Sequence, residues 1–155
     1  AAPGELFLVR NVGNVVPHPS LPGGTAAAME YAVEVLEVEN VIVCGHTQCG
    51  AIQAILHPET VEHLPSVTRW GDGGGELRRG MSERYAQLEG DALATVAVQE
   101  NVLLQVENLR RFEFVEKKLA AGKLHISAWV FKIATGQVFD FDPESGEFVE
   151  LSPDE

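Results

Sequence analysis

The sequence predicts an α/β fold, in which a mostly parallel central sheet is flanked by helices and ends in an antiparallel C-terminal edge strand or hairpin. Three observations support this prediction. A β-branched run at 41–43 lies between two segments of helical character, and strand–helix alternation is typical of parallel sheets. Later, a long helical stretch precedes two strand-like segments, 124–133 and 137–141. The short segment between these two, Ala134-Thr135-Gly136, predicts a hairpin turn.

The first third of the chain carries four expected elements. The apolar run at 6–9 predicts a buried strand, which ends at a loop rich in Gly and Asn. Apolar residues recur at helical spacing over 25–36, so we expect an amphipathic helix with Thr25 as its N-cap. Residues 41–44 predict a fully buried parallel strand, and 50–56 predict the start of the next helix.

In the rest of the chain, a segment rich in proline and glycine is followed by segments with helical and strand patterns. Proline and glycine residues between 57 and 82 predict an exposed, mobile insertion. A long helix is expected from about 82 to 109, with a break near Gly90, and its second half is apolar on more than one face. A shorter helix over 114–121, ending at Gly122, precedes the C-terminal strands.

Composition narrows the class of protein. The chain has 155 residues, 45% of them hydrophobic, which predicts one domain over 1–155 with a substantial core. It has no apolar run long enough to span a membrane. The formal net charge of −12 disfavours binding to nucleic acid or to anionic lipid surfaces. Because the sequence does not start with Met, we expect that it begins partway through a longer gene product.

The segment from Val43 to Gly50 carries the most informative chemistry, at the point where a strand gives way to a helix. His46 and Cys49 are three residues apart across a tight turn, so an imidazole and a thiolate can converge on one zinc ion. The same pattern also fits a buried cysteine and a hydrogen-bonded histidine at a strand end. Cys44 is expected inside the strand as a small buried thiol, which makes it a poorer ligand candidate. Two cysteines beside a histidine favour a reducing compartment and metal chemistry over a disulfide framework.

Three stretches in the same order and spacing resemble the central part of β-class carbonic anhydrases, especially the plant and cyanobacterial carboxysomal branches. They are Gly-Glu-Leu-Phe-Leu-Val-Arg-Asn-Val-Gly-Asn at 4–14, Ala-Ala-Ala-Met-Glu-Tyr-Ala at 26–32 and Val-Ile-Val-Cys-Gly-His-Thr-Gln-Cys-Gly at 41–50. The tail, with Trp-Val-Phe at 129–131, also fits the family pattern. The resemblance spans nearly the whole chain.

The resemblance implies a zinc enzyme that reversibly hydrates carbon dioxide to bicarbonate by means of zinc-bound hydroxide. It matches His46 and Cys49 to two of the three protein ligands of the metal. It matches Gly50 to a residue whose backbone N–H faces the substrate.

The resemblance also assigns residues around the substrate. Phe7, Val12 and Tyr31 match the apolar lining of the carbon dioxide pocket, and the family contributes the tyrosine across a dimer interface. Arg10 matches a position that helps to hold bicarbonate in some regulated bacterial members. The resemblance further implies a homodimer or a higher homo-oligomer, in the cytoplasm, a carboxysome or a plastid.

One part of the family pattern is absent from this sequence. The family places a Cys-x-Asp-x-Arg segment, which supplies the third zinc ligand and an Asp–Arg pair, on a strand before the position of Gly4. Three explanations stay open at this point. They are a portion of an active carbonic anhydrase that lacks the family's N-terminal strand and helices, a catalytically silent binding or scaffold module, and a related zinc hydrolase such as a carbon disulfide hydrolase.

Overall fold

The computed structural model of the chain describes residues 2–21, 23–71 and 74–152. In chain order, its helices and strands are η1 (Val12–Asn14), α1 (Gly24–Glu30), η2 (Tyr31–Val35), β1 (Asn40–His46), α2 (Gly50–Leu56), η3 (Pro58–Val61), α3 (Pro65–Gly71), α4 (Gly75–Arg84), α5 (Gly90–Arg110), α6 (Glu113–Ala120), β2 (His125–Lys132), β3 (Gln137–Asp142) and β4 (Glu147–Glu150). No helix in the described part of the chain is both long and apolar enough to cross a bilayer.

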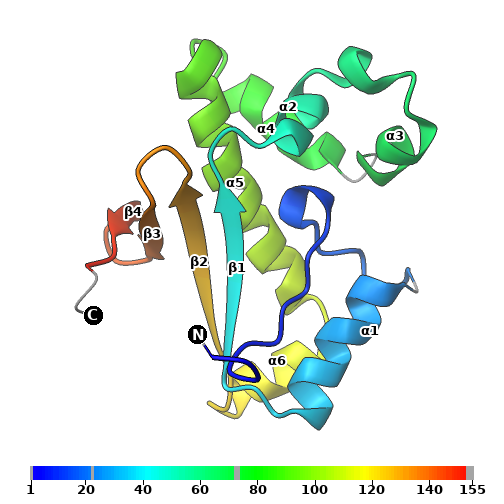
Figure 1. Cartoon of the computed structure of the whole chain (residues 1–155), viewed down its shortest axis with the longest axis vertical. Coiled ribbons are helices and arrows are strands. Elements are labelled where there is room, and N and C mark those ends of the chain that lie inside the picture. The colour runs from blue at the N-terminus through cyan, green and yellow to red at the C-terminus, as the bar shows by residue number, and fades with distance from the viewer. Residues whose placement is uncertain (1, 22, 72–73, 153–155) are drawn as a thin grey trace.

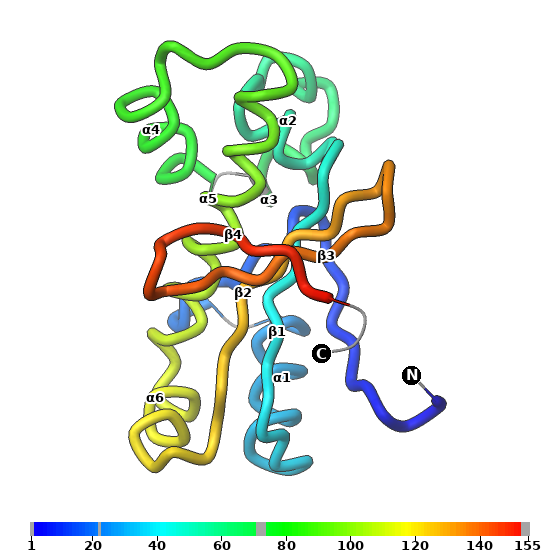
Figure 2. Tube along the Cα trace, turned by 90° about the vertical axis from the view of Figure 1, so that its left-hand side faces the viewer, coloured from blue at the N-terminus to red at the C-terminus, as the bar shows by residue number. Residues whose placement is uncertain are grey.

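The four strands form one sheet in the order β1-β2-β3-β4. β1 and β2 are parallel, in a register that sets Asn40 opposite His125 and His46 opposite Phe131. β3 and β4 follow as antiparallel strands, with Trp129 paired to Asp140 across β2 and β3. The sheet twists strongly, so the C-terminal hairpin crosses the direction of β1 and β2 (Figure 2). The α/β class and the antiparallel C-terminal edge are confirmed, and within the described residues the sheet is mixed.

The core lies between the parallel strands and α5, which runs alongside them (Figure 1). Val98 and Val102 of α5 are almost fully buried, as are Val43 of β1 and Val130 of β2. The approach at Gly45 is so close that an added Cβ would lie 2.6 Å from a methyl group of Val102. A glycine in the strand therefore allows α5 to pack directly against the backbone of β1.

β1 is covered on one face only, contrary to the prediction of a fully buried strand. Its burial alternates along the strand, with Val43 and Gly45 buried and Ile42, Cys44 and His46 exposed. The sequence of β1 is continuously apolar because the strand belongs to a parallel pair. Apolar character therefore predicted the strand correctly but not how many of its faces are covered.

The predicted strand at 6–9 does not form within the described chain. These residues form no regular structure and have no strand partner, and Leu6 and Leu8 are 60% and 72% exposed. The edge of β1 opposite β2 likewise pairs with no strand of the described residues. Among the described residues, the run at 6–9 and the outer edge of β1 therefore have no strand partner.

The helix predicted over 25–36 begins one residue earlier and changes character midway. Gly23, and not Thr25, is its N-cap. From Tyr31 to Val35 the helix widens to π geometry, and the Leu36 N–H donates to the carbonyl of Tyr31 at 3.0 Å. Ala32 and Val33 are the buried residues of this turn, whereas Tyr31 is 51% exposed.

The segment 57–82, predicted as an irregular insertion, contains η3, α3 and most of α4. Pro58 and Pro65 are the first residues of η3 and α3, and α4 starts at Gly75. The predicted break near Gly90 is confirmed, since α4 ends at Arg84 and α5 begins at Gly90. Proline at the first position of a helix favours helix initiation, because its missing N–H would have no partner there.

Candidate metal and substrate site

The two predicted metal ligands flank a two-residue turn at the carboxyl end of β1. His46 is the last residue of β1, and Cys49 is the N-cap of α2 with φ −73° and ψ 112°. Between them, Gln48 adopts a positive φ of 58°, which is uncommon for a residue other than glycine. This left-handed residue turns the chain from the strand into the helix within two residues.

Thr47 fixes this turn to the neighbouring strand. Its backbone N–H donates to the carbonyl of Phe131 at 3.0 Å, and its Oγ1 accepts from the backbone N–H of Ile133 at 3.1 Å. The carbonyl of Thr47 lies 2.9 Å from Nδ1 of His46. A carbonyl can only accept, so Nδ1 carries the proton and the lone pair of the neutral imidazole is on Nε2. The turn therefore orients His46 with a free ligating nitrogen.

The three side chains that can provide nitrogen or sulfur ligands in this region differ in their surroundings. His46 is exposed, whereas Cys49 is 7% exposed and joins the apolar core beside Ile52. Cys44 is exposed on β1, contrary to the prediction of a buried thiol. Partial burial of its sulfur raises the pKa of the Cys44 thiol, against a smaller lowering by the backbone of Phe131.

His46 and Cys49 supply the donor types that zinc prefers, one imidazole nitrogen and one sulfur. Within residues 2–21, 23–71 and 74–152, no cluster of three or more His, Cys, Asp or Glu side chains is placed to hold a metal ion. This segment therefore offers two of the four donors that a tetrahedral zinc site needs. The space in front of α2 is open, because a Cβ added at Gly50 would meet no atom within 4 Å.

The predicted substrate residues fall into two places. The rings of Phe7 and Tyr31 lie together, with centroids 6.5 Å apart and planes tilted by 30°. Val12 lies instead in η1, beside a small cavity of about 100 Å³ between that turn, α2 and α3. Arg10 is exposed, and no carboxylate of the described residues lies within ion-pair distance of it.

Buried amides on α5, which the sequence analysis missed, hold the loop that follows Val12. Asn101 donates from Nδ2 to the carbonyl of Gly13 at 3.2 Å and to Oδ1 of Asn14 at 3.1 Å. Gln105 accepts from the backbone N–H of Val16 at 2.8 Å and donates to Asn101 at 3.0 Å. Asn101 and Gln105 are 1% and 4% exposed. Two amides four residues apart in an otherwise apolar helical stretch are a signal that could have identified them.

Trp70 holds the same loop from the other side and was also missed. Its indole Nε1–H donates to the carbonyl of Val12 at 2.7 Å, across 58 residues of sequence. No local pattern predicts this contact, because it depends on where α3 packs.

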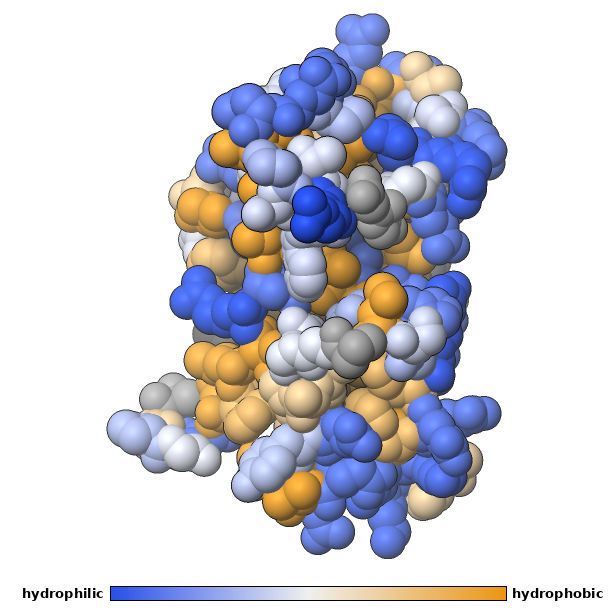
Figure 3. Space-filling view, turned by 90° about the vertical axis from the view of Figure 1, so that its right-hand side faces the viewer, coloured by the Kyte–Doolittle hydropathy of each residue, from blue (hydrophilic) through white to orange (hydrophobic). Residues whose placement is uncertain are grey.

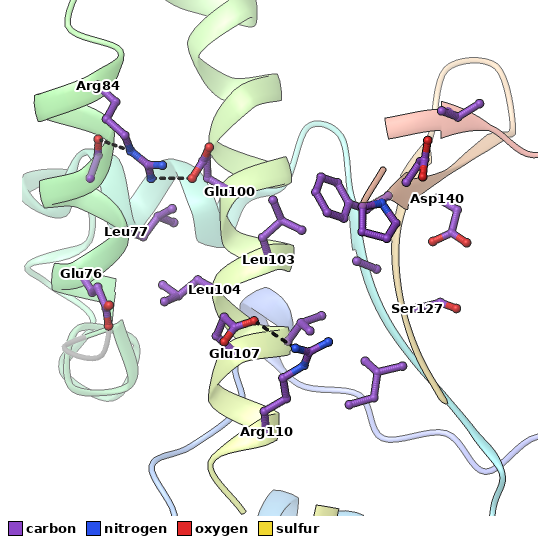
Figure 4. Close-up of a pocket in the computed structure, with 18 of the residues that line it drawn as sticks. Glu76, Leu77, Arg84, Glu100, Leu103, Leu104, Glu107, Arg110, Ser127 and Asp140 are labelled. Carbon is purple, nitrogen blue, oxygen red and sulfur yellow. Dashed lines mark hydrogen bonds and ion pairs between the residues drawn. The ribbon is translucent and has the colours of Figure 1, made fainter. Parts of the chain in front are cut away.

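A larger cavity, of about 1050 Å³, lies between α4 and α5 on one side and β2, β3 and β4 on the other (Figure 4). Ion pairs between Arg84 and Glu100 and between Arg110 and Glu107 lie along its helical wall. It is lined by none of the residues predicted from the sequence for metal or substrate. Size alone therefore does not locate the candidate site in this chain.

Comparisons with known proteins agree with the resemblance in the sequence. The family model described as "Carbonic anhydrase" matches residues 1–138. A carbonic anhydrase of Synechocystis sp. is 39% identical over 148 residues, which cover 94% of this chain and 54% of that protein. A carbonic anhydrase of Pseudomonas aeruginosa is 39% identical over 151 residues, which cover 97% of this chain and 68% of the relative. The chain spans about half the length of the cyanobacterial relative.

Solved structures extend the agreement to the fold. The β-carbonic anhydrase CcaA matches with a TM-score of 0.93 and 38% identity, over 97% of this chain and 74% of that one. A β-carbonic anhydrase of Coccomyxa, solved in complex with acetazolamide, matches with a TM-score of 0.74 and 31% identity. The match covers 96% of this chain and 68% of the Coccomyxa chain. From the matched family model, the identities and the shared fold, we conclude that this chain belongs to the carbonic anhydrase family, in its β class.

Proposed function

We propose that this chain forms part of a zinc enzyme that interconverts carbon dioxide and bicarbonate, with His46 and Cys49 as two of the metal ligands. The observation that carries the proposal is the turn at the end of β1, which sets an imidazole and a sulfur on either side of Thr47 and Gln48. Membership of the β-carbonic anhydrase family supports the reaction. A bound zinc ion would supply a Lewis acid that activates water near neutral pH.

The chain's own residues would perform three further tasks. The hydrogen bond from His46 to Thr47 would hold the imidazole in the tautomer that ligates through Nε2. The N–H of Gly50, at the open start of α2, would donate to a substrate oxygen. Phe7, Val12 and Tyr31 would exclude water from the bound carbon dioxide, and Arg10 would hold bicarbonate.

The remaining ligand would come from the Cys-x-Asp-x-Arg segment that the resemblance expects upstream or on another chain. The unpaired edge of β1 supports this proposal, because it can accept a further strand beside His46. We also propose self-association, since the ring pair of Phe7 and Tyr31 is about half exposed. Hydrophobic side chains gather on the side of the molecule shown in Figure 3.

Replacement of the ligands in the complete natural polypeptide tests this proposal. His46→Ala and Cys49→Ser should each lower the zinc content and reduce the rate of carbon dioxide hydration, measured by stopped flow, by more than about 100-fold. Loss of a group that only orients a metal ligand already lowers metal affinity or activity by about 10–100-fold. Cys44→Ser is the matched control, because Cys44 is exposed on the same strand and is not a proposed ligand. Unchanged turnover in either ligand variant would refute the assignment.

The absence of a third ligand within the described residues favours a second candidate, a catalytically silent binding module. Metal analysis combined with sedimentation separates the two. An active enzyme should hold about one zinc per subunit in a stable oligomer. A silent module should associate with little bound zinc and without measurable hydration.

A further inference from the structure

The loop that carries Val12 is held from two sides by side chains of different elements. On the inner side, the amide of Asn101 on α5 donates to the carbonyl of Gly13. On the outer side, the indole of Trp70 on α3 donates to the carbonyl of Val12 at 2.7 Å. Gly13 and Asn14 have positive φ angles of 77° and 45°, a backbone arrangement that persists only when its surroundings hold it.

Packing alone does not fix the outer end of this loop. Gly13 fits tightly against α2, where an added Cβ would lie 3.2 Å from that of Ala51. One residue earlier, Val12 is 55% exposed and borders the cavity of about 100 Å³ that also touches Ala54 and Trp70. Asn11 closes the loop by two hydrogen bonds of 2.8 Å to the backbone of Val15. Among the described residues, the indole of Trp70 is the contact from another element that holds the carbonyl of Val12 itself.

We propose that Trp70 is a positioning residue for substrate, which acts by holding the Val12 carbonyl and thereby the Val12 side chain beside the start of α2. This inference rests on the proposed function, in which Val12 lines the carbon dioxide pocket. It gives α3 a role in the site although α3 supplies none of the proposed ligands. The helix α3 acts on the loop that carries Val12 through one hydrogen bond, from the indole of Trp70.

The test compares two tryptophans in the zinc-loaded complete polypeptide. Trp70→Phe keeps an aromatic ring and removes the N–H that holds Val12. Trp129→Phe is the matched control, because the buried indole nitrogen of Trp129 has no hydrogen-bond partner within the described residues. Urea unfolding confirms that both variants fold, and metal analysis compares their zinc content with that of the unsubstituted protein.

We expect Trp70→Phe to raise KM for carbon dioxide about fivefold, the effect of losing one neutral hydrogen bond. Its kcat and zinc content should stay within about twofold, because a contact that binds ground state and transition state equally affects KM alone. Trp129→Phe should change neither constant. In a Val12→Ala background, Trp70→Phe should add little, because the indole acts through Val12.

Three outcomes would overturn the inference. An unchanged KM in Trp70→Phe would show that the indole bond does not position substrate, while an active unsubstituted protein would leave the proposed function intact. Equal losses of kcat and zinc would assign Trp70 a structural role only. An unsubstituted protein that holds zinc and does not hydrate carbon dioxide would overturn the proposed function and, with it, the inference.

Discussion

The two faces of the parallel strand pair are built for different purposes. On the face toward α5, Val43 and Gly45 of β1 and Val130 of β2 are buried. On the opposite face, Ile42, Cys44 and His46 are exposed along the same strand. The covered face stabilises the fold, and the uncovered face carries the candidate metal ligand at its end. Residues adjacent in sequence should therefore respond very differently to substitution.

The largest effect is expected from a single added methyl group on the covered face. Gly45→Ala would place its Cβ 2.6 Å from a methyl group of Val102 and 3.2 Å from one of Val98. We expect the free energy of unfolding to fall by about 3 kcal/mol, the upper end of the usual cost of adding a group to a well-packed core. Urea denaturation measures it.

Gly50→Ala is the matched control for this substitution, because its Cβ would meet no atom within 4 Å at the start of α2. Its free energy of unfolding should stay within about 1 kcal/mol of the unsubstituted value. Equal stability of the Gly45→Ala and Gly50→Ala variants would contradict the close packing of α5 on β1.

A smaller difference in the free energy of unfolding is expected between substitutions of the neighbouring residues Ile42 and Val43. Val43→Ala removes methyl groups from a side chain that is 8% exposed, and should cost about 2 kcal/mol. Ile42→Ala removes more atoms, but its side chain is 43% exposed, so the cost should stay below about 1 kcal/mol. Denaturation of both variants under one set of conditions checks this ranking. A larger loss for Ile42→Ala would show that another surface covers this face in solution.

The smallest expected effect concerns the two thiols and does not change the fold. Cys44 is exposed and Cys49 is buried, so iodoacetamide should modify Cys44 first in the native protein. Because partial burial raises the pKa of the Cys44 thiol, less thiolate is present at a given pH than for free cysteine. Its alkylation rate should therefore still be rising above about pH 8.5, the pKa of an ordinary cysteine.

Mass spectrometry across a pH series measures both rates, and Cys44→Ser provides the background. Modification of Cys49 at the rate of Cys44 in the folded protein would contradict the burial that distinguishes the two cysteines.

Local patterns predicted the elements whose own residues carry a strong secondary-structure signal. The β-branched run of β1, the helix that starts at Gly50 and the hairpin around Gly136, which has a φ of 74°, all follow from short stretches of residues. The run at 6–9 was wrong as a buried strand, because burial requires a neighbouring strand that the described residues do not supply. Propensity describes what a segment can form and not what pairs with it.

The candidate site divides in the same way. His46 and Cys49 could be identified from a motif because three residues of backbone bring them to one turn. Asn101 carries a local signal, an amide in an apolar helical stretch, but its contact with Gly13 spans 88 residues and that of Trp70 with Val12 spans 58, so no motif predicts either contact. The prediction of an irregular segment around Pro58 and Pro65 was wrong for a different reason. Proline ends one helix and begins another equally well, and only the surrounding structure distinguishes the two uses.

The buried amides of α5 make the length of that helix between Asn101 and Gln105 unalterable. Each residue turns an α-helix by about 100°, so one insertion between the two amides would rotate one of them out of reach of the loop. The number of residues between these two anchors of Gly13 and Val16 therefore cannot change without breaking one of the hydrogen bonds. The turn between α4 and α5 is tied to α5 at its start, where the hydroxyl of Tyr85 donates to Glu100 at 2.6 Å, so an insertion there should be better tolerated after Tyr85.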